Sequence, residues 1–421
     1  MKPLLARLAL LLALAFAGVA VADEAPAPAD ASREILVMLR LPPPHYRSGA
    51  NYGGAYADSA GSAARRRIAD GIAHEQGLTV LSAWPMPAIG VDCYVLRVPA
   101  GADLDEAVRR LSADGRIEWA QPVHRFHALD ASVKPVGAAA RVSLYSLQPS
   151  ARLWQLDDLH KVSTGRGVRV AVIDSGVDAA HPDLAGRIEF ERNFVDARAQ
   201  VAEAHGTAVA GIIGARADRG MGVVGIAPQA QLLALRACWE ESAAVTLCSS
   251  FTLAQALQAA IVADAQVINL SLSGPDDRLL ARLLDAAIAR GAIVVGAVDA
   301  QAPGGGFPAS HAGVLAVSDR VGVGASVLSA PGDDVPAPAP GARWNFVSGS
   351  SFAAAQVAGM LALARAVTRE PAMRQSSAWV RFPADSPDGA AGYVDACATL
   401  RHSVPALDCL SSREEAARVP R

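Results

Sequence analysis

Along the second half of the chain, short runs of consecutive apolar residues alternate with segments whose apolar positions repeat at helical spacing. Strands that are apolar at every position are typical of a parallel sheet covered by helices on both faces. The predicted strands span 168–173, 231–237, 266–272, 292–297 and 314–317, and the predicted helices span 251–263 and 276–290. The pattern therefore predicts an α/β fold built on such a sheet.

The pattern before residue 128 differs and indicates a smaller domain. Strands are predicted at 34–41, 78–84, 91–98 and 117–126, and helices at 62–76 and from about 104 to 115. Asp103 followed by Glu106 is typical of a helix N-terminus, and Gly115 ends that helix. The order β-α-β-β-α-β predicts a ferredoxin-like α+β domain. We place this domain at 33–128, a linker without a clear period at 129–150, the larger domain at 151–411 and a tail at 412–421.

Residues 1–22 have the pattern of an export signal. Lys2 and Arg7 precede an apolar run of 15 residues, and Ala20-Val21-Ala22 fits a small-residue cleavage site. The run is shorter than the roughly 20 residues of a membrane-spanning helix, and we expect no later stretch to be long and apolar enough to span. The chain is therefore predicted to be secreted or periplasmic, with no membrane span in the mature form.

Export also changes the interpretation of the five cysteines, because disulfides persist outside the cytoplasm. Neighbour pairing would join Cys238 to Cys248 and Cys397 to Cys409, and it leaves Cys93 unpaired. No spacing of Cys or His suggests a zinc site, and no aspartate-rich loop with the spacing of a calcium site is present. We therefore predict no metal and no cofactor, and leave calcium open.

The 421 residues carry 41 acidic and 38 basic side chains, for a net charge of −3. No basic stripe interleaved with aromatic residues is present, which argues against nucleic acid as a partner. We expect a globular monomer.

Three short segments place different catalytic residue types at the end of a predicted strand or the start of a predicted helix. Asp174 follows the strand at 168–173, at the edge where α/β folds build their sites. His205 opens the run His205-Gly-Thr-Ala-Val-Ala-Gly211. The third segment, Ser348-Gly-Ser-Ser-Phe-Ala-Ala-Ala355, leads into an apolar helix whose free N–H groups could stabilise an oxyanion. Taken singly, each residue is more commonly a turn, core or capping residue.

Taken together, in the order Asp, His, Ser, the three segments resemble the motifs of the subtilisin-like serine proteases, or subtilases. The family motifs D-[ST]-G-[VI], H-G-T-x-V-A-G and G-T-S-M-A-x-P match 174–177, 205–211 and 349–355. This alignment makes Ser351, rather than Ser350, the nucleophile. The resemblance covers most of 154–400, and includes Gly225-Ile-Ala-Pro228, Val267-Ile-Asn-Leu-Ser-Leu272 and Ala330-Pro-Gly332.

The resemblance implies a subtilisin-like fold and a serine endopeptidase that acts on proteins or peptides. Ser351 would attack the peptide carbonyl, His205 would carry the proton, and Asp174 would orient His205. The family segment that pairs with an extended substrate matches Ser271, Leu272 and Ser273. The N-terminal domain resembles the subtilase propeptide, so we expect a self-processing zymogen whose propeptide is also its partner.

Some positions depart from the family motifs. The substituted positions in the His and Ser motifs are Ala208, Ser350, Phe352 and Ala355, and none of them carries a reacting atom. The segment 294–300 lacks the Asn that subtilases use as a side-chain donor to the oxyanion. Asp299 is the nearest candidate for that role, and a shift of one residue would put Ala300 there instead.

Two other functions are consistent with parts of the sequence. A catalytically impaired subtilase-fold protein that binds peptides would explain the missing Asn, but the three matching motifs argue against it. An α/β-hydrolase esterase would use 349–353 as a degenerate G-x-S-x-G motif and would need its acid and His after the Ser. Only Asp385, Asp388 and His402 follow, on too little chain to complete that fold.

Overall fold

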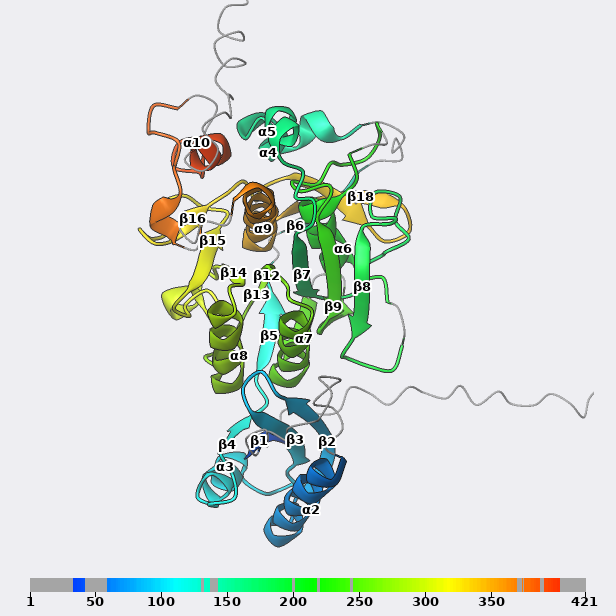
Figure 1. The fold of residues 1–421 in the computed structure, drawn as a ribbon, viewed down its shortest axis with the longest axis vertical. Coiled ribbons are helices and arrows are strands. Elements are labelled where there is room, and N and C mark those ends of the chain that lie inside the picture. The colour runs from blue at the N-terminus through cyan, green and yellow to red at the C-terminus, as the bar shows by residue number, and fades with distance from the viewer. Residues whose placement is uncertain are drawn as a thin grey trace, which may run out of the picture. The chain divides into compact units, whose positions relative to one another are not determined.

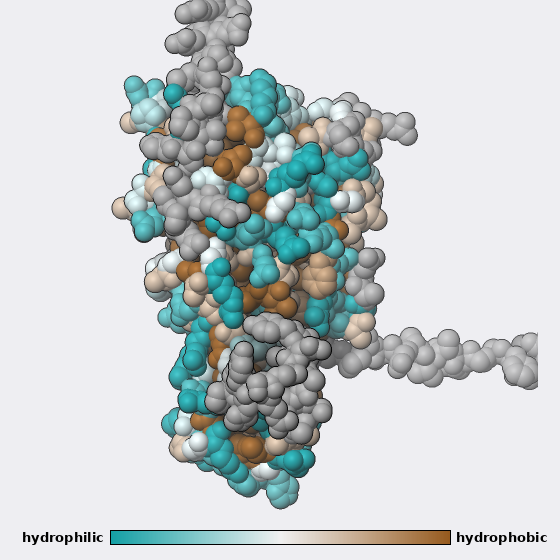
Figure 2. Space-filling model, viewed as in Figure 1, coloured by the Kyte–Doolittle hydropathy of each residue, from teal (hydrophilic) through white to brown (hydrophobic). Residues whose placement is uncertain are grey.

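The computed structural model describes residues 33–41, 59–129, 132–136, 143–198, 201–217, 220–242, 245–368, 373, 375–386 and 390–401. The predicted signal peptide 1–22, Cys409 and the tail 412–421 lie outside these residues. All described residues belong to one compact unit (Figure 1). On the face shown in Figure 2, polar side chains are interspersed with small apolar patches.

The N-terminal elements form an antiparallel sheet in the order β2-β3-β1-β4. They are β1 (Glu34–Arg40), α2 (Ser59–Gln76), β2 (Thr79–Met86), β3 (Val91–Arg97), α3 (Leu104–Ser112) and β4 (Trp119–Pro122). Asp103 caps α3 by accepting a hydrogen bond from the Glu106 backbone N–H at 2.9 Å. A separate core with Ile72, Leu96 and Leu111 at its centre fills the space between this sheet and its helices. The element order is the predicted one.

The strand predicted at 117–126 is two strands, which corrects the sequence analysis. β4 pairs with β1, and this pairing ends at the hydrogen bond from the Val123 N–H to the Glu34 carbonyl, because β1 begins at Glu34. The chain then leaves this sheet. Its next strand, β5 (Arg125–Ala128), pairs with β11 (Val245–Ser249) on one side and β13 (Leu272–Ser273) on the other.

The larger domain contains a seven-stranded parallel sheet in the order β16-β15-β14-β12-β7-β9-β8. Its strands are β7 (Arg169–Asp174), β8 (Ile188–Asn193), β9 (Gln231–Arg236), β12 (Val267–Leu270), β14 (Ile293–Ala297), β15 (Val314–Ser318) and β16 (Leu328–Ser329). The five predicted strands are confirmed. β8 was missed because it is a half-exposed edge strand with charged residues, which breaks the apolar run.

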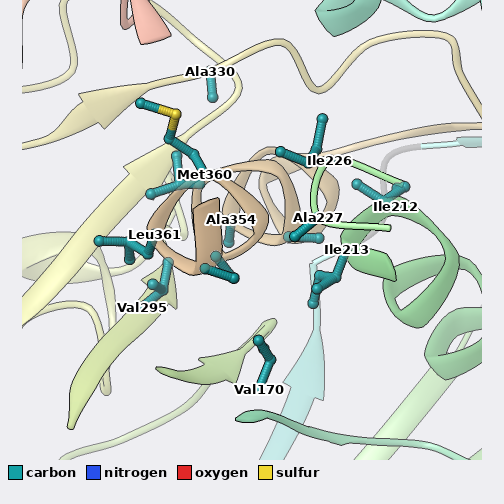
Figure 3. Close-up of a cluster of buried hydrophobic side chains, with 14 of the residues drawn as sticks. Val170, Ile212, Ile213, Ile226, Ala227, Val295, Ala330, Ala354, Met360 and Leu361 are labelled. Carbon is teal, nitrogen blue, oxygen red and sulfur yellow. The ribbon is translucent and has the colours of Figure 1, made fainter. Parts of the chain in front are cut away.

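Helices cover this sheet, and α9 is buried along most of its length. The long helices are α6 (Ala204–Gly214), α7 (Ser250–Val262), α8 (Arg278–Ala289) and α9 (Ser350–Val367), and the short ones are α4 (Pro149–Leu153), α5 (Leu156–Val162) and α10 (Ala396–Arg401). In the core, Leu361 of α9 lies toward Val295 of β14, and Ile226 and Ile213 lie on the other side of the helix (Figure 3).

By length and composition alone, α9 could cross a membrane. The expectation that no such stretch follows the signal is therefore wrong. Within the described fold, however, 83% of its most apolar window is buried inside the protein, as the core helix of a globular domain would be.

Residues 129–150, predicted to be a linker, contain regular structure. β6 (Ser132–Pro135) joins β17 (Val335–Ala339) and β18 (Arg343–Ser348) in an antiparallel sheet of order β17-β18-β6. A 3₁₀ turn at Tyr145–Leu147 and the start of α4 follow. The segment has no period of its own because its strand forms only against a partner some 200 residues away in sequence.

The predicted disulfide between Cys238 and Cys248 is confirmed. It joins β10 (Cys238–Ser242) to β11 at residues that face each other across the hairpin. Cys93 is free and buried, and its burial raises the pKa of the thiol. The predicted pairing of Cys397 with Cys409 involves a residue outside the described ones.

Candidate active site

Asp174 ends β7 at the carboxyl edge of the parallel sheet. The strand order reverses between β7 and β12, which is where open α/β sheets form a crevice. The Asp174 Oδ1 accepts a hydrogen bond from the Ser175 backbone N–H at 2.6 Å and lies 2.6 Å from the Nδ1 of His205. Because both side chains are buried, this contact holds the carboxylate and the imidazole in one arrangement.

His205 lies in the first turn of α6, next to the loop that follows β7. Its backbone N–H donates to Glu240 Oε1 at 2.9 Å, and the next N–H, that of Gly206, donates to the Ser175 hydroxyl at 2.9 Å. A Cβ on Gly206 would overlap the Ser175 carbonyl group. Glycine after the histidine is therefore what lets α6 approach β7 closely enough for His205 to reach Asp174.

Ser351 lies in the first turn of α9 and is fully buried. Its hydroxyl donates to the Ser271 carbonyl at 3.0 Å and accepts from the Leu129 backbone N–H at 3.1 Å. The Phe352 ring that follows packs 5.5 Å from the His205 ring, so the start of α9 lies beside the imidazole. The Ser350 hydroxyl instead donates to Asp319 at 2.8 Å. Of the two adjacent serines, Ser351 is the one that contacts a peptide segment.

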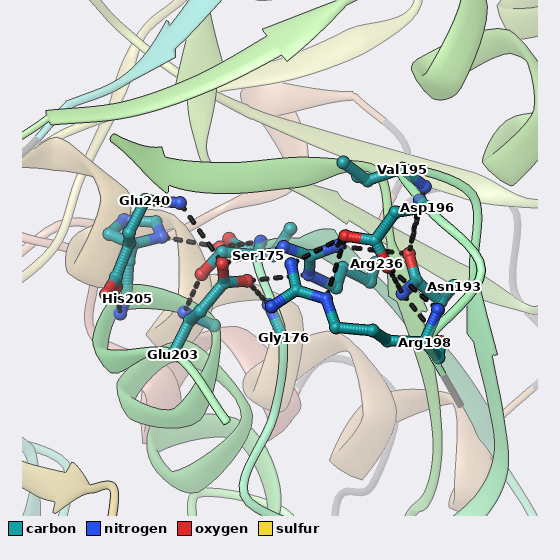
Figure 4. A network of polar contacts seen from close by, with 12 residues as sticks. Ser175, Gly176, Asn193, Val195, Asp196, Arg198, Glu203, His205, Arg236 and Glu240 are labelled. Carbon is teal, nitrogen blue, oxygen red and sulfur yellow. Dashed lines mark hydrogen bonds and ion pairs between the residues drawn. The ribbon is translucent and has the colours of Figure 1, made fainter. Parts of the chain in front are cut away.

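A buried ion pair between Arg236 and Glu203 stabilises this arrangement (Figure 4). Arg236, which faces Asp174 across the β7–β9 pair, donates to both Glu203 carboxylate oxygens at 2.8 Å. Glu203 also accepts from the Gly176 N–H at 2.6 Å and the Glu240 N–H at 3.2 Å. Burial raises the pKa of Glu203, but Arg236 and these N–H groups together hold it below its ordinary value. The carboxylate thus links the loop after Asp174 to the start of α6.

A peptide strand already occupies the cleft, and it belongs to this chain. Ala128 and His127 of β5 pair with Leu272 and Ser273, while the other edge of β5 pairs with β11. Leu129, which directly follows β5, reaches Ser351 through its N–H. Of the predicted substrate-binding residues, Leu272 and Ser273 therefore pair with an extended peptide, and that peptide is the end of the N-terminal domain. The Ser271 carbonyl instead accepts from the Ser351 hydroxyl.

Phe126 of β5, three residues before Leu129, fills a pocket in the larger domain. Its side chain is buried, and its ring centre lies 6.3 Å from that of Phe307. A Cβ on Gly274 would overlap the Phe126 ring. The pocket is therefore open to an aromatic side chain only because residue 274 has no side chain.

Residues 165–381 match the model of the subtilase family, Peptidase S8. The chain belongs to the subtilase family. An intracellular serine protease of Paenibacillus polymyxa is 35% identical over 222 residues, which are 47% of this chain and 67% of that protein. Subtilisin NAT of Bacillus subtilis subsp. natto is 30% identical over 285 residues, or 63% and 69% of the two chains.

The fold is also similar to a solved structure. Fervidolysin from Fervidobacterium pennivorans, described as a keratinolytic enzyme related to subtilisin, matches with a TM-score of 0.63 at 20% identity. The match covers 88% of this chain and 61% of that one. The predicted subtilisin-like fold is confirmed, and as a subtilase the chain is a serine-type endopeptidase.

In this subtilase, Asp299 lies just after β14 and is held by its own turn. Its Oδ1 accepts from the Gln301 N–H at 2.9 Å, and its Oδ2 lies 3.6 Å from the His127 imidazole of β5. Ala300, the alternative in the other alignment, is exposed and has no side-chain donor. The role of Asp299 in an oxyanion hole stays a prediction.

Sequence reasoning missed the residues that surround the predicted ones. Glu203, Arg236 and Glu240 belong to no motif, although Arg236 is a charged residue at the end of an otherwise apolar strand. That position was a usable signal, because a charge at the end of a buried strand needs a partner. The insertion of β5 into the cleft had no signal in the sequence pattern.

Within the described ranges, no group of three or more His, Cys, Asp or Glu side chains is placed to hold a metal ion. The expectation of no metal and no cofactor stays a prediction, with calcium left open.

Proposed function

We propose that this subtilase hydrolyses peptide bonds with Asp174, His205 and Ser351 as its catalytic triad. The observation that carries the proposal is an extended peptide strand that ends with the Leu129 N–H at 3.1 Å from the Ser351 hydroxyl. The contact of 2.6 Å between Asp174 and His205 supports the other half of the triad. A nucleophile, a base and a residue that orients the base are what peptide hydrolysis by serine requires.

In the proposed reaction, Ser351 Oγ forms a bond to the peptide carbonyl carbon while His205 takes its proton. His205 then gives that proton to the departing amine, and the bond between carbon and nitrogen breaks. Water then attacks the carbonyl carbon of the acyl-enzyme while His205 takes a proton from it. His205 returns this proton to Ser351 Oγ as the bond between Oγ and the acyl carbon breaks. Asp174 stays ionised, fixes the tautomer of His205 and stabilises the imidazolium. The N-terminal end of α9 would stabilise the growing negative charge through its helix dipole.

We propose further that the N-terminal domain is a propeptide and that the enzyme cuts its own chain between Leu129 and Asp130. β5 would be the substrate before this cut and an inhibitor after it, because it fills the strand positions that other substrates need. Contacts between the N-terminal domain and α8 would keep that domain bound after the cut. Trp119 packs 4.9 Å from the guanidinium groups of Arg278 and Arg282, and Gln121 accepts from the Leu279 N–H at 3.1 Å.

We propose that the protein works outside the cytoplasm. The export pattern at 1–22 and the disulfide between Cys238 and Cys248 support this, since disulfides form and persist in oxidising compartments. One relative is named an intracellular protease, so the family alone does not settle the compartment. N-terminal sequencing of protein recovered from the periplasm or medium tests the proposal.

A second candidate, a subtilase that binds peptides without turnover, is favoured by one observation, the absence of Asn in 294–300. A fluorophosphonate probe separates the two, because only an activated serine reacts with it. Labelling of Ser351 in the matured protein would contradict the binding-module hypothesis. A folded, matured-length protein that is not labelled would contradict the protease.

Asp299→Asn should raise kcat on a good peptide substrate at pH 8. Asn can keep the Oδ1 contact with the Gln301 N–H while its amide replaces a carboxylate oxygen that would repel the oxyanion. One side-chain donor of this kind is worth roughly 10²–10³ in kcat, which sets the upper limit of the gain. Initial rates across pH measure it. Ala300→Asn is the matched control, and an increase there alone would assign the position to residue 300.

Gly274→Val should reduce cleavage of substrates that have Phe four residues before the cut bond. The new side chain would occupy the space of the Phe126 ring. Burying such a side chain is worth about 1.5–3 kcal/mol, so we expect a loss of roughly 10- to 100-fold in kcat/KM for Phe-His-Ala-Leu-p-nitroanilide. Ala-His-Ala-Leu-p-nitroanilide should be nearly unaffected, and an equal loss on both substrates would remove the pocket assignment.

A further inference from the structure

The edge of β18 beside the nucleophile carries a second strand of this chain. β6 pairs with it in antiparallel register, with Ser132 opposite Ser348 and Pro135 opposite Asn345. Ser348 is three residues before Ser351, so the strand pair begins next to the nucleophile. β5 precedes Leu129 and β6 follows it. The chain thus forms strands with the enzyme on both sides of the bond that we propose is cut.

The attachment of β6 does not depend on Leu129. The Val136 N–H donates to the Trp344 carbonyl at 3.0 Å, and the Val136 side chain packs on the cluster that contains Trp344 and Leu144. Leu144 in turn donates to the Gly222 carbonyl at 2.7 Å. These contacts lie on the C-terminal side of β6, in the part of the chain that stays with the larger domain after the cut.

We propose that β6 remains on β18 after cleavage. The new N-terminal segment of the mature enzyme then covers the edge of β18 that would bind substrate residues on the leaving-group side of the cut bond. The edge of β18 is then a binding site for extended peptide backbone, and residues 132–135 are its resident occupant. This inference rests on the proposed self-processing. A tethered strand acts at an effective concentration in the millimolar range, so a substrate must displace it to use this edge.

The occupant can be displaced because backbone pairing, rather than side-chain burial, holds it. Val133, Lys134 and Pro135 are exposed. The ion pair from Lys134 to Asp334 at 2.8 Å joins two exposed side chains and adds little. Residues of a substrate beyond the second after the cut bond should therefore compete with β6. The mature enzyme should gain little from lengthening a substrate on that side.

The test compares two substrates in matured wild type and in a matured variant with both Val133→Pro and Lys134→Pro, each freed of its N-terminal domain. Neighbouring N–H groups in a strand point to opposite sides, so this pair of changes removes at least one bond to β18. The control carries Val133→Thr and Lys134→Arg. The substrates are Phe-His-Ala-Leu-p-nitroanilide, with no residue after the bond, and a fluorogenic peptide with six residues after it.

We expect the proline variant to cleave the long peptide with a kcat/KM on the order of ten-fold above wild type, and the p-nitroanilide at the wild-type rate. The control should match wild type on both. The same ratio of the two activities in all three proteins would overturn the inference. Loss of p-nitroanilide turnover in matured wild type would instead contradict the proposed function.

Hydrogen exchange decides the question if the proline variant does not fold. The amides of 132–136 in matured wild type should stay as protected as in the uncleaved Ser351→Ala precursor. Fast exchange there after cleavage would mean that β6 leaves β18, and would overturn the inference without any variant of β6.

Discussion

Replacing Ser351 with alanine should abolish both self-cleavage and peptide hydrolysis while leaving the precursor folded. The change removes one hydroxyl whose partners are the Ser271 carbonyl and the Leu129 N–H, and no part of the apolar core. Loss of a triad nucleophile reduces kcat by on the order of 10⁶. Mass spectrometry of the purified protein should find a mature N-terminus at Asp130 for wild type and none for the variant.

Ser350→Ala is the matched control, because it removes the adjacent hydroxyl, which bonds to Asp319 instead. We expect this variant to mature and to cleave casein at close to the wild-type rate. Maturation of Ser351→Ala together with failure of Ser350→Ala would transfer the nucleophile to residue 350. A wild-type N-terminus well away from Asp130 would contradict the proposed cut even if the triad is correct.

Arg236→Leu should destabilise the protein by about 3–5 kcal/mol, because it leaves the buried Glu203 carboxylate without its counter-charge. Both oxygens of that carboxylate lose a hydrogen bond of 2.8 Å from the guanidinium group. Urea unfolding in the Ser351→Ala background measures the effect without self-digestion. Lys161→Met, which breaks a surface ion pair with Asp158, is the control and should leave stability nearly unchanged.

The size of this effect should depend on pH. In wild type, the pKa of Glu203 is lowered from its ordinary 4.5, so its contribution to stability is present above that value and is lost as pH falls through the lowered pKa. Without Arg236, burial is left to raise the pKa of Glu203. The orphaned carboxyl group then becomes neutral more easily as pH falls, and a neutral group is less costly to bury. The destabilisation should be smaller at pH 5 than at pH 8.

A double variant separates the electrostatic contribution of the ion pair from the packing contribution of its side chains. Replacing both Glu203 and Arg236 with leucine should destabilise the protein less than Arg236→Leu alone, since no unpaired charge remains. Equal losses in the single and double variants would show that the Glu203 carboxylate stays solvated without Arg236. In that case the ion pair would not be what stiffens the loop after Asp174.

Much of the parallel sheet could be predicted because its strands are buried on both faces. Such strands are apolar at most positions, and β7, β9, β12, β14 and β15 were located from that property. The edge strand β8 has charged residues facing solvent and no such run. A strand that is buried on one face only has no continuous apolar run, so this pattern does not locate it.

Sequence by itself determined which residues are candidates for chemistry, because each occupies a position with local consequences. Asp174 follows an apolar strand, His205 precedes the small residues that let α6 approach that strand, and Ser351 opens an apolar helix. The disulfide between Cys238 and Cys248 was likewise predictable from proximity, since ten residues can form one hairpin.

Only the tertiary structure decided what these residues contact. β5 and β6 have ordinary sequences, and their places between β11 and β13 and beside β18 depend on unpaired backbone edges that exist only once the larger domain has folded. The ion pair of Glu203 and Arg236 likewise joins residues 33 apart in the chain. Local patterns record whether a residue is buried. Pairing between distant segments is set by shape and by unsatisfied N–H and C=O groups, which no local pattern encodes.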